Sequence, residues 1–333
     1  MNTRRLTCLC LLLTVSAFGQ RLRQVAMIDL PGLPGFETVA IANGHLLVAH
    51  SAADTVDIFD LTKRRVIAQV KHVRGASGIA VDDKNGRVFL SSHDRHSIVV
   101  INSADWEVQS MIPVQSEVEH IAYVPANNRL YLSNSREQSI GFVDFAHNNA
   151  VHKIDAGGMP ERIVYDPVKN VIYATLQDKH AVAAYDMDLK KVSQWNLKAS
   201  QPTGMALDDS ARRLYVAVRY AVVTLDADTG NELSRIGAPA GVDSLWYDRP
   251  SGTVYAAAGG SVSVMKVRDG GLTRDAELNL DVRGHSIAYD SKSRLIYVPG
   301  GREGRSKLLI LKQFEGEALA FRPKGSKANG EGQ

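Results

Sequence analysis

Cysteine is almost absent from this 333-residue chain. The two cysteines, Cys8 and Cys10, both lie in an apolar stretch near the N-terminus. If that stretch is removed after export, the remaining chain has no thiol, which excludes disulfides, thiolate-bound metals, covalent haem attachment and a cysteine nucleophile. A domain of this length can be stable from its hydrophobic core alone, so export without disulfides is physically reasonable.

Long apolar runs are also missing. The one candidate, Leu6 to Ala17, has 12 residues, which is short of the roughly 20 that a membrane-spanning helix needs. Arg4 and Arg5 precede this run and small residues follow it, which is the layout of a cleavable secretory signal. We therefore expect residues 1–20 to be a signal peptide, the mature chain to have no membrane span, and the protein to be periplasmic or secreted.

Neither sign of charge dominates. The chain has 39 basic and 36 acidic residues, and loss of Arg4 and Arg5 with the signal leaves 37 against 36, a net charge near +1. Nucleic acid is therefore an unlikely partner, because such proteins carry a clear basic excess. Residues 315–333 are rich in Gly, Ala, Lys and Glu, and we expect them to form a flexible tail.

Common catalytic motifs are absent as well. The sequence contains neither a Gly-x-Ser-x-Gly nucleophile elbow nor a His-Glu-x-x-His metal motif. Function therefore has to be sought in the architecture and in the residues that the architecture brings together.

A repeat of about 42 residues runs through the chain. Its first landmark is an apolar residue at Val39, Ile79, Ile121, Ile163, Met205, Leu245 and Ile287. Its second landmark follows ten residues later, except in the first unit, where it follows after eight, at Leu47, Phe89, Tyr131, Tyr173, Tyr215, Tyr255 and Tyr297. Apolar residues alternate around both landmarks and polar turns separate them, which predicts antiparallel strands rather than helices.

Each unit contains four short strands of this kind, which is the content of one β-propeller blade. We therefore predict an all-β fold, a seven-bladed β-propeller of four-stranded antiparallel blades, over residues 21–314. The segment Gln24 to Ile28 has the pattern of an outermost strand, so we expect this N-terminal strand to join the last blade and close the ring. The alternative is closure by Ala318 to Phe321.

Two of the units resemble a known repeat. Tyr131-Leu132-Ser133-Asn134 followed by Ile140 to Asp144, and Val88 to Ser92 followed by Ile98 to Asn102, are similar to the YVTN repeat of exported bacterial and archaeal propellers. The resemblance covers all seven units in degenerate form. It implies an exported propeller and no particular reaction, although lactonase-type propellers of similar fold use carboxylates, a histidine and a metal at the channel mouth.

The residues just before each first landmark should ring the mouth of the central channel, where propellers commonly bind ligands. This rule selects a set of acidic and basic side chains: Glu37, Glu119, His120, Glu161, Arg162, Asp243 and His285. The four carboxylates Glu37, Glu119, Glu161 and Asp243 are candidate ligands of a divalent cation such as calcium, or could simply hydrate a polar funnel, with Arg162 relieving their repulsion.

Histidines supply the candidate acid–base groups. His120 and His285 lie beside the carboxylates, and His96 and His180 occupy equivalent places before the third strands of their units. Equivalent places could bring these last two to one rim, as additional ligand-binding or acid–base groups.

Two functions fit these residues. The first is a binding or scaffold protein that acts through the loop face around the channel, on an unidentified protein, peptide, glycan or small molecule. The second is a metal-dependent, lactonase-type hydrolase that uses the mouth carboxylates and a histidine. We expect the protein to be a monomer in either case.

Overall fold

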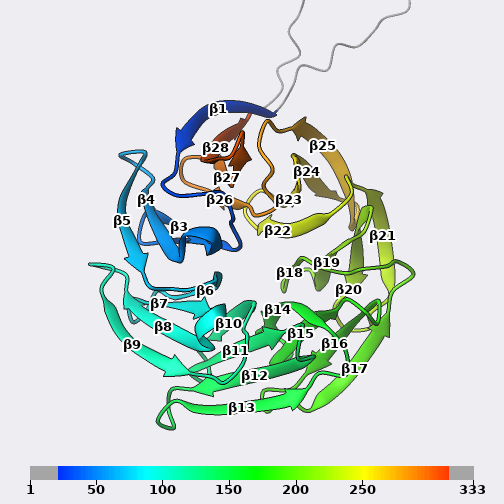
Figure 1. Ribbon diagram of the computed structural model, residues 1–333. Coiled ribbons are helices and arrows are strands. Elements are labelled where there is room, and N and C mark those ends of the chain that lie inside the picture. The colour runs from blue at the N-terminus through cyan, green and yellow to red at the C-terminus, as the bar shows by residue number, and fades with distance from the viewer. Residues whose placement is uncertain (1–21, 315–333) are drawn as a thin grey trace, which may run out of the picture.

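The computed structural model describes residues 22–314 and forms a ring of seven four-stranded antiparallel sheets (Figure 1). The predicted seven-bladed propeller is thus confirmed. The expected signal peptide, residues 1–20, the expected tail, residues 315–333, and the alternative closing segment Ala318 to Phe321 lie outside the described residues. Within residues 22–314, no helix is long and apolar enough to cross a membrane.

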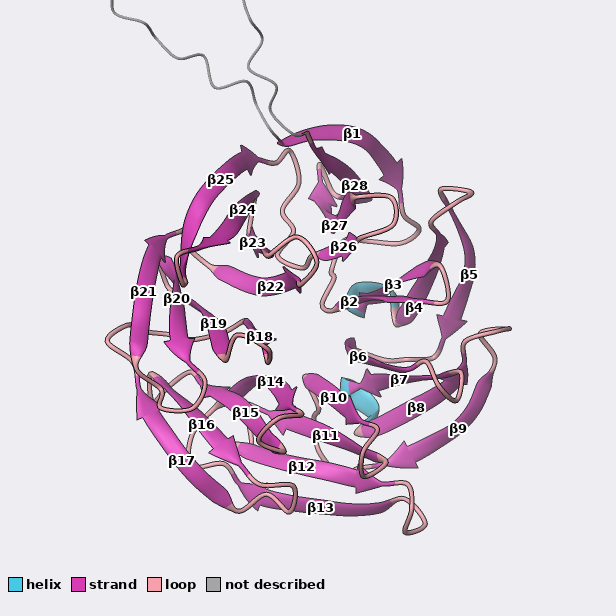
Figure 2. Ribbon diagram, turned by 180° about the vertical axis from the view of Figure 1, so that it is seen from behind, coloured by secondary structure: helices cyan, strands magenta, loops and turns pink. Residues whose placement is uncertain are grey.

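The blades follow one another in chain order, each running from an innermost to an outermost strand (Figure 2). Blades one and two contain β2 (Val39–Ala42), β3 (His45–His50), β4 (Thr55–Asp60), β5 (Arg65–Lys71), β6 (Ala76–Asp82), β7 (Arg87–Ser92), β8 (Ser97–Asn102) and β9 (Val108–Pro113). Blades three and four contain β10 (His120–Val124), β11 (Arg129–Asn134), β12 (Ser139–Asp144), β13 (Ala150–Asp155), β14 (Pro160–Asp166), β15 (Val171–Leu176), β16 (Ala181–Tyr185) and β17 (Lys191–Asn196).

Blades five and six contain β18 (Met205–Asp208), β19 (Arg213–Val218), β20 (Ala221–Asp226), β21 (Glu232–Gly237), β22 (Val242–Asp248), β23 (Thr253–Ala258), β24 (Ser261–Arg268) and β25 (Gly271–Asn279). Blade seven contains β26 (Ala288–Asp290), β27 (Leu295–Arg302), β28 (Arg305–Gln313) and, as its outermost strand, β1 (Leu22–Asp29). Short 3₁₀ turns, η1 (Ser51–Ala53) and η2 (His93–Arg95), join the second and third strands of blades one and two.

The N-terminal strand closes the ring, as the sequence predicted. β1 pairs antiparallel with β28, from Leu22 opposite Gln313 to Asp29 opposite Lys307. Figure 1 shows blue β1 on the outer side of red β28, so the first and last described strands lie in one sheet. This pairing satisfies backbone groups of β28 that would otherwise form an open edge, and it joins the first and last blades without a covalent link.

The core consists of the faces between neighbouring blades. The tyrosines at the second landmark, Tyr131, Tyr173, Tyr215, Tyr255 and Tyr297, are each no more than 2% exposed. Two of them also donate to a backbone carbonyl of the next blade, Tyr131 to that of Met187 at 2.7 Å and Tyr173 to that of Ala227 at 2.6 Å. An aromatic ring with a polar tip thus fills the apolar interface and reaches a backbone acceptor at its rim.

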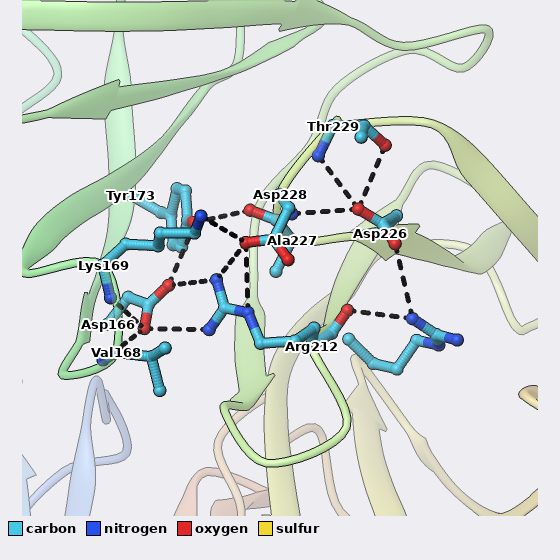
Figure 3. A network of polar contacts seen from close by, with 10 residues as sticks. Asp166, Val168, Lys169, Tyr173, Arg212, Asp226, Ala227, Asp228 and Thr229 are labelled. Carbon is cyan, nitrogen blue, oxygen red and sulfur yellow. Dashed lines mark hydrogen bonds and ion pairs between the residues drawn. The ribbon is translucent and has the colours of Figure 1, made fainter.

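Ion pairs join neighbouring blades on the side where the first strands end. The Arg212 guanidinium of blade five binds the Asp166 carboxylate of blade four through two parallel hydrogen bonds of 3.0 and 2.7 Å, and also contacts Asp228 (Figure 3). Burial would raise the pKa of Asp166, but the hydrogen bonds from Arg212 and from nearby backbone amides outweigh it and hold the pKa below its usual value. Since Asp166 is fully buried, loss of Arg212 would leave an unpaired charge between the two blades.

Tyr247 joins blades six and five by a hydrogen bond from an uncharged side chain. Its hydroxyl donates to the buried Asp208 carboxylate at 2.6 Å. We expect Tyr247→Phe to lower the free energy of unfolding by about 1 kcal/mol, because one hydrogen bond to a buried carboxylate is lost and the ring remains. Urea denaturation should show this loss. Tyr165→Phe, which removes an exposed hydrogen bond within one blade, should cost less than half as much, and equal effects would contradict the assignment.

Candidate functional site

The predicted mouth residues line one cavity. Its volume is about 610 Å³, and it lies where the segments before the first strands meet the loops between the second and third strands. All seven side chains predicted from the repeat contribute to it: Glu37, Glu119, His120, Glu161, Arg162, Asp243 and His285. The structure therefore gathers residues that are spread over some 250 positions of the chain into one concave, polar site, and we refer to this cavity as the channel mouth.

Hydroxyl groups fix the backbone around the channel mouth. At five of the blade junctions, a Ser or Thr donates to a backbone carbonyl of the next blade: Ser77 to Glu119, Ser133 to Glu161, Thr175 to Thr203, Thr203 to Val242 and Ser286 to Glu37. Three of the five acceptors belong to predicted acidic residues. The hydrogen bonds that join the blades therefore also position the backbone of those acids, which leaves their side chains free for other contacts.

Glycine allows one of these close approaches. A Cβ atom at Gly204 would lie 2.4 Å from the backbone oxygen of Asp243, well inside van der Waals contact. The glycine before the first landmark of blade five thus lets the Asp243 segment of blade six lie against it. Position 204 therefore offers no side chain to the channel mouth, because the backbone of Asp243 occupies that space.

Two of the acids resist ionisation. Burial and the negative charges of Glu119, Asp243 and Glu37 raise the pKa of Glu161 to about 7. Burial also raises the pKa of Glu37, with smaller contributions from Asp243 and Glu119. No hydrogen bond neutralises either carboxyl within the described residues, so each retains its capacity to accept one from a ligand.

The other two acids already have partners. Glu119 accepts hydrogen bonds from the Ser135 hydroxyl, at 2.7 and 2.6 Å to its two oxygens. Asp243 lies 2.7 Å from Nδ1 of His285. Burial would raise the pKa of Asp243, but this hydrogen bond and the charge on His285 hold it below its usual value, and the same hydrogen bond raises the pKa of His285.

His120 and Arg162 differ from this pair. Burial and the nearby charge of Arg162 lower the pKa of His120 to about 3, so its imidazole is neutral in the physiological range. Its Nε2 lies 4.0 Å from Glu161, and its buried Nδ1 has no hydrogen-bond partner among the described residues. Burial lowers the pKa of the Arg162 guanidinium, while Asp243 and Glu161 favour its charge.

The structure does not bring the other two predicted histidines to the mouth. His96 and His180 both have positive φ, 49° and 51°, and end the turns before their third strands, and neither contributes to the cavity. Nδ1 of His180 is instead 3.1 Å from the carbonyl oxygen of Gln177. Their equivalent places reflect the backbone geometry of the turn, which explains why the repeat position alone could not assign them to the site.

Other polar side chains of the mouth were not among the site residues predicted from the sequence. Ser135, His93 and Asp94 reach it from the loops between second and third strands. His93 contacts Asp94 at 3.0 Å and Glu117 at 3.6 Å. Their loops were identified, but only the packing of neighbouring blades decides which loop residue faces the channel.

The four carboxylates do not form a metal-binding set. Among residues 22–314, no group of three or more His, Asp or Glu side chains is arranged to hold a metal ion. The Glu119 carboxylate accepts a hydrogen bond from Ser135, and that of Asp243 contacts His285. The arrangement therefore does not fit the calcium site that the equivalent positions of the four acids in their blades suggested. The metal-dependent hydrolase accordingly has no assembled ligand set in the described chain.

Comparison with known proteins finds the fold but no family. No protein-family model matches the chain, and no curated protein matches it. Among solved structures, the β-propeller domain of Cps50 (Swd1) from Myceliophteria thermophila is similar, with a TM-score of 0.72 and 15% identity over 87% of this chain and 99% of that domain. The likeness shows the fold alone. Membership of the YVTN family stays a prediction from the repeat.

Proposed function

We propose that this chain is a non-catalytic binding protein whose channel mouth recognises a positively charged group, an amine or a guanidinium, on its ligand. The observation that carries the proposal is the charge of the mouth. Five carboxylates line it, Asp94 among them, against the guanidinium of Arg162 and the imidazolium of His285, an excess of three negative charges when all are ionised. A concave site of one sign attracts and orients the opposite charge.

The unpartnered acids favour binding over chemistry. Glu37 and Glu161 are shielded from water yet accept no hydrogen bond from a described residue, so a ligand ammonium would relieve both their repulsion and their incomplete hydrogen bonding. The histidines are less suited to acid–base work. His285 is held by Asp243 and by the backbone of Phe36, and His120 is neutral and not hydrogen-bonded to a nucleophile.

Export forms part of the proposal. The charged and apolar layout of residues 1–20 supports a signal peptide, and a mature chain without cysteine suits a periplasmic or secreted protein as well as any other. The ligand would then be met outside the cytoplasm, by a single propeller acting as a monomer.

Probe peptides test the proposal. Acetylated, amidated hexapeptides of Ala and Ser that carry one Lys are passed over the immobilised protein, beside peptides with Gln in place of Lys, and binding is measured by surface plasmon resonance. The Lys peptides should bind and the Gln peptides should not. Glu37→Gln should weaken the Lys peptides about fivefold, because one partly desolvated charge pair is lost.

Glu107→Gln is the matched control, since this exposed glutamate of the turn before β9 lines no described cavity, and it should leave the affinity unchanged. Equal binding of Lys and Gln peptides would contradict the proposal. So would stoichiometric metal in the purified protein together with metal-dependent hydrolysis of a lactone, which would restore the enzyme hypothesis.

A further inference from the structure

A second cavity adjoins the channel mouth. Its volume is about 770 Å³, and three chain segments line it: residues 34–37 before blade one, residues 281–285 before blade seven, and residues 299–304 at the tip of the β27–β28 hairpin. Glu37 and His285 line both this cavity and the mouth. The two spaces are therefore neighbouring parts of one depression that runs from the channel outwards over blade seven.

The outer part exists because blade seven departs from the repeat. β27 and β28 have 8 and 9 residues, whereas the second and third strands of blades one to five have five or six. The extra residues extend this hairpin beside the segment before blade one. Arg283 and Gly301 pair through two backbone hydrogen bonds, of 2.9 and 3.1 Å, which tie the hairpin to the segment before β26.

Glycines let these walls meet backbone to backbone. A Cβ at Gly284 would lie 2.2 Å from the carbonyl oxygen of Pro299, one at Gly300 would lie 2.8 Å from that of Arg283, and one at Gly301 would lie 2.9 Å from Cβ of Pro34. Each substitution would push two segments apart. The cavity thus has walls set by close backbone packing, which makes it preformed rather than a chance gap between mobile loops.

The chemistry of the outer cavity differs from that of the mouth. Arg283 lines it with an exposed side chain that forms no ion pair within 4 Å with any residue in the described part of the chain. Arg302 is engaged by two carboxylates that also line this cavity, at 3.7 Å from Asp281 and 3.9 Å from Glu303, which leaves Arg283 as the arginine available to a ligand. Phe36 and Pro299 contribute apolar atoms to the lining of the same cavity. A guanidinium with free donors beside apolar surface suits a carboxylate, which it can bind through two hydrogen bonds.

We propose that the outer cavity is a second subsite, which binds a carboxylate of the same ligand through Arg283, and that the ligand is an extended peptide segment with a basic and an acidic residue a few positions apart. This inference rests on the proposed function of the mouth. A peptide fits because its side chains carry both charges and apolar groups at intervals of about 3.3 Å along an extended backbone.

The test uses hexapeptides of Ala and Ser that carry one Lys and one Glu separated by one to four residues, with matched peptides in which Gln replaces the Glu. Binding to the full chain is measured by surface plasmon resonance. At the best spacing, the Lys–Glu peptide should bind about fivefold more tightly than its Lys–Gln match, and Arg283→Ala should abolish that difference without changing the affinity for the Lys–Gln peptide.

Arg305→Ala is the control, because Arg305 is an exposed arginine of the same hairpin that does not line the cavity, and it should preserve the difference. If Arg283→Ala leaves the difference intact while Glu37→Gln still weakens the Lys peptides, the second subsite is wrong and the mouth proposal stands. If Glu37→Gln is without effect too, both fail. Binding of polygalacturonate through Arg283 with no need for a basic group would replace the peptide with an acidic glycan.

Discussion

Replacing Arg212 with alanine is expected to lower the free energy of unfolding by about 3 kcal/mol at pH 7. The substitution leaves the fully buried Asp166 carboxylate without the guanidinium that binds it through two hydrogen bonds (Figure 3). The backbone amides of Val168 and Lys169 still donate to that carboxylate, which keeps the cost from being larger. Urea denaturation, or the thermal midpoint at a fixed scan rate, measures the loss.

The neighbouring arginine provides the matched control. Arg213 of β19 lies 3.5 Å from Asp226, its partner on β20, and both side chains are in part open to solvent, so Arg213→Ala should cost less than about 1 kcal/mol. Arg212→Lys should fall between the two, because lysine keeps the charge but cannot form the paired hydrogen bonds. Similar losses for both alanine variants would show that the blades are not joined by the Asp166 contact.

Acid should reduce the loss of stability that Arg212→Ala causes. The pKa of Asp166 is below its usual value in the folded protein, so the stability that this pairing contributes is present above the unfolded pKa near 4 and is lost as the pH falls through the lower, folded value. The difference between wild type and Arg212→Ala should therefore shrink when the denaturation is repeated in acid. A deficit that stays constant with pH would indicate lost packing in place of lost charge pairing.

In contrast to Arg212→Ala, Glu161→Gln is expected to raise the free energy of unfolding, by about 2 kcal/mol at pH 8. The pKa of Glu161 is raised to about 7, so burial favours the protonated form, and ionising the carboxyl above that pH costs stability that a neutral amide does not lose. The advantage should develop as the pH rises from about 4.5, the unfolded value, to about 7, and be almost absent at pH 4.

The same substitution should weaken the Lys probe peptides about tenfold at pH 8, because it removes an unpartnered carboxylate of the mouth. In the wild type, affinity for these peptides should rise between pH 6 and pH 8 as Glu161 ionises. Glu107→Gln, at an exposed position, should change neither stability nor affinity. If Glu161→Gln gains stability but keeps full affinity, Glu161 does not take part in binding, and its raised pKa reflects its surroundings in the fold alone.

A residue that lowers stability while it serves binding is common at ligand sites, because a site must keep charges and hydrogen-bonding groups unsatisfied until the ligand arrives. Glu161 and Arg212 illustrate the two cases in one molecule. Both are ionisable and largely shielded from water, but Arg212 is matched by a carboxylate of the neighbouring blade. Glu161 instead faces three other acids, whose effect Arg162 offsets only in part, and accepts no hydrogen bond from a described residue.

Much of the fold could be read from the repeat because a blade is a local structure. Its strands lie within about 42 residues, and the alternation of apolar residues sets which face each strand buries. The closing strand was also predictable. The segment Gln24 to Ile28 has the outer-strand pattern and no partner of its own, and the pairing of β1 with β28 fulfils that expectation.

The channel mouth was predictable in membership but not in detail. Repeat symmetry places equivalent residues at equivalent depths, so Glu37, Glu119, Glu161 and Asp243 had to meet. The pairing of Asp243 with His285 and of Glu119 with Ser135 depends on rotamers and on contacts between blades. One feature of the sequence indicated the outer cavity. The interval from the second landmark to the third strand is 11 residues in blade seven, from Tyr297 to Leu308, and nine or seven in the other blades.

The sequence by itself therefore determined the number of blades, their strand order, the closing strand and the residues around the channel, because each follows from a local pattern repeated along the chain. Only the tertiary structure decided which charges neutralise one another. Arg212 and Asp166 are 46 residues apart, and Arg283 pairs with Gly301 in the extended part of the β27–β28 hairpin. Such contacts arise where blades pack together, and the electrostatics of the mouth depend on that packing.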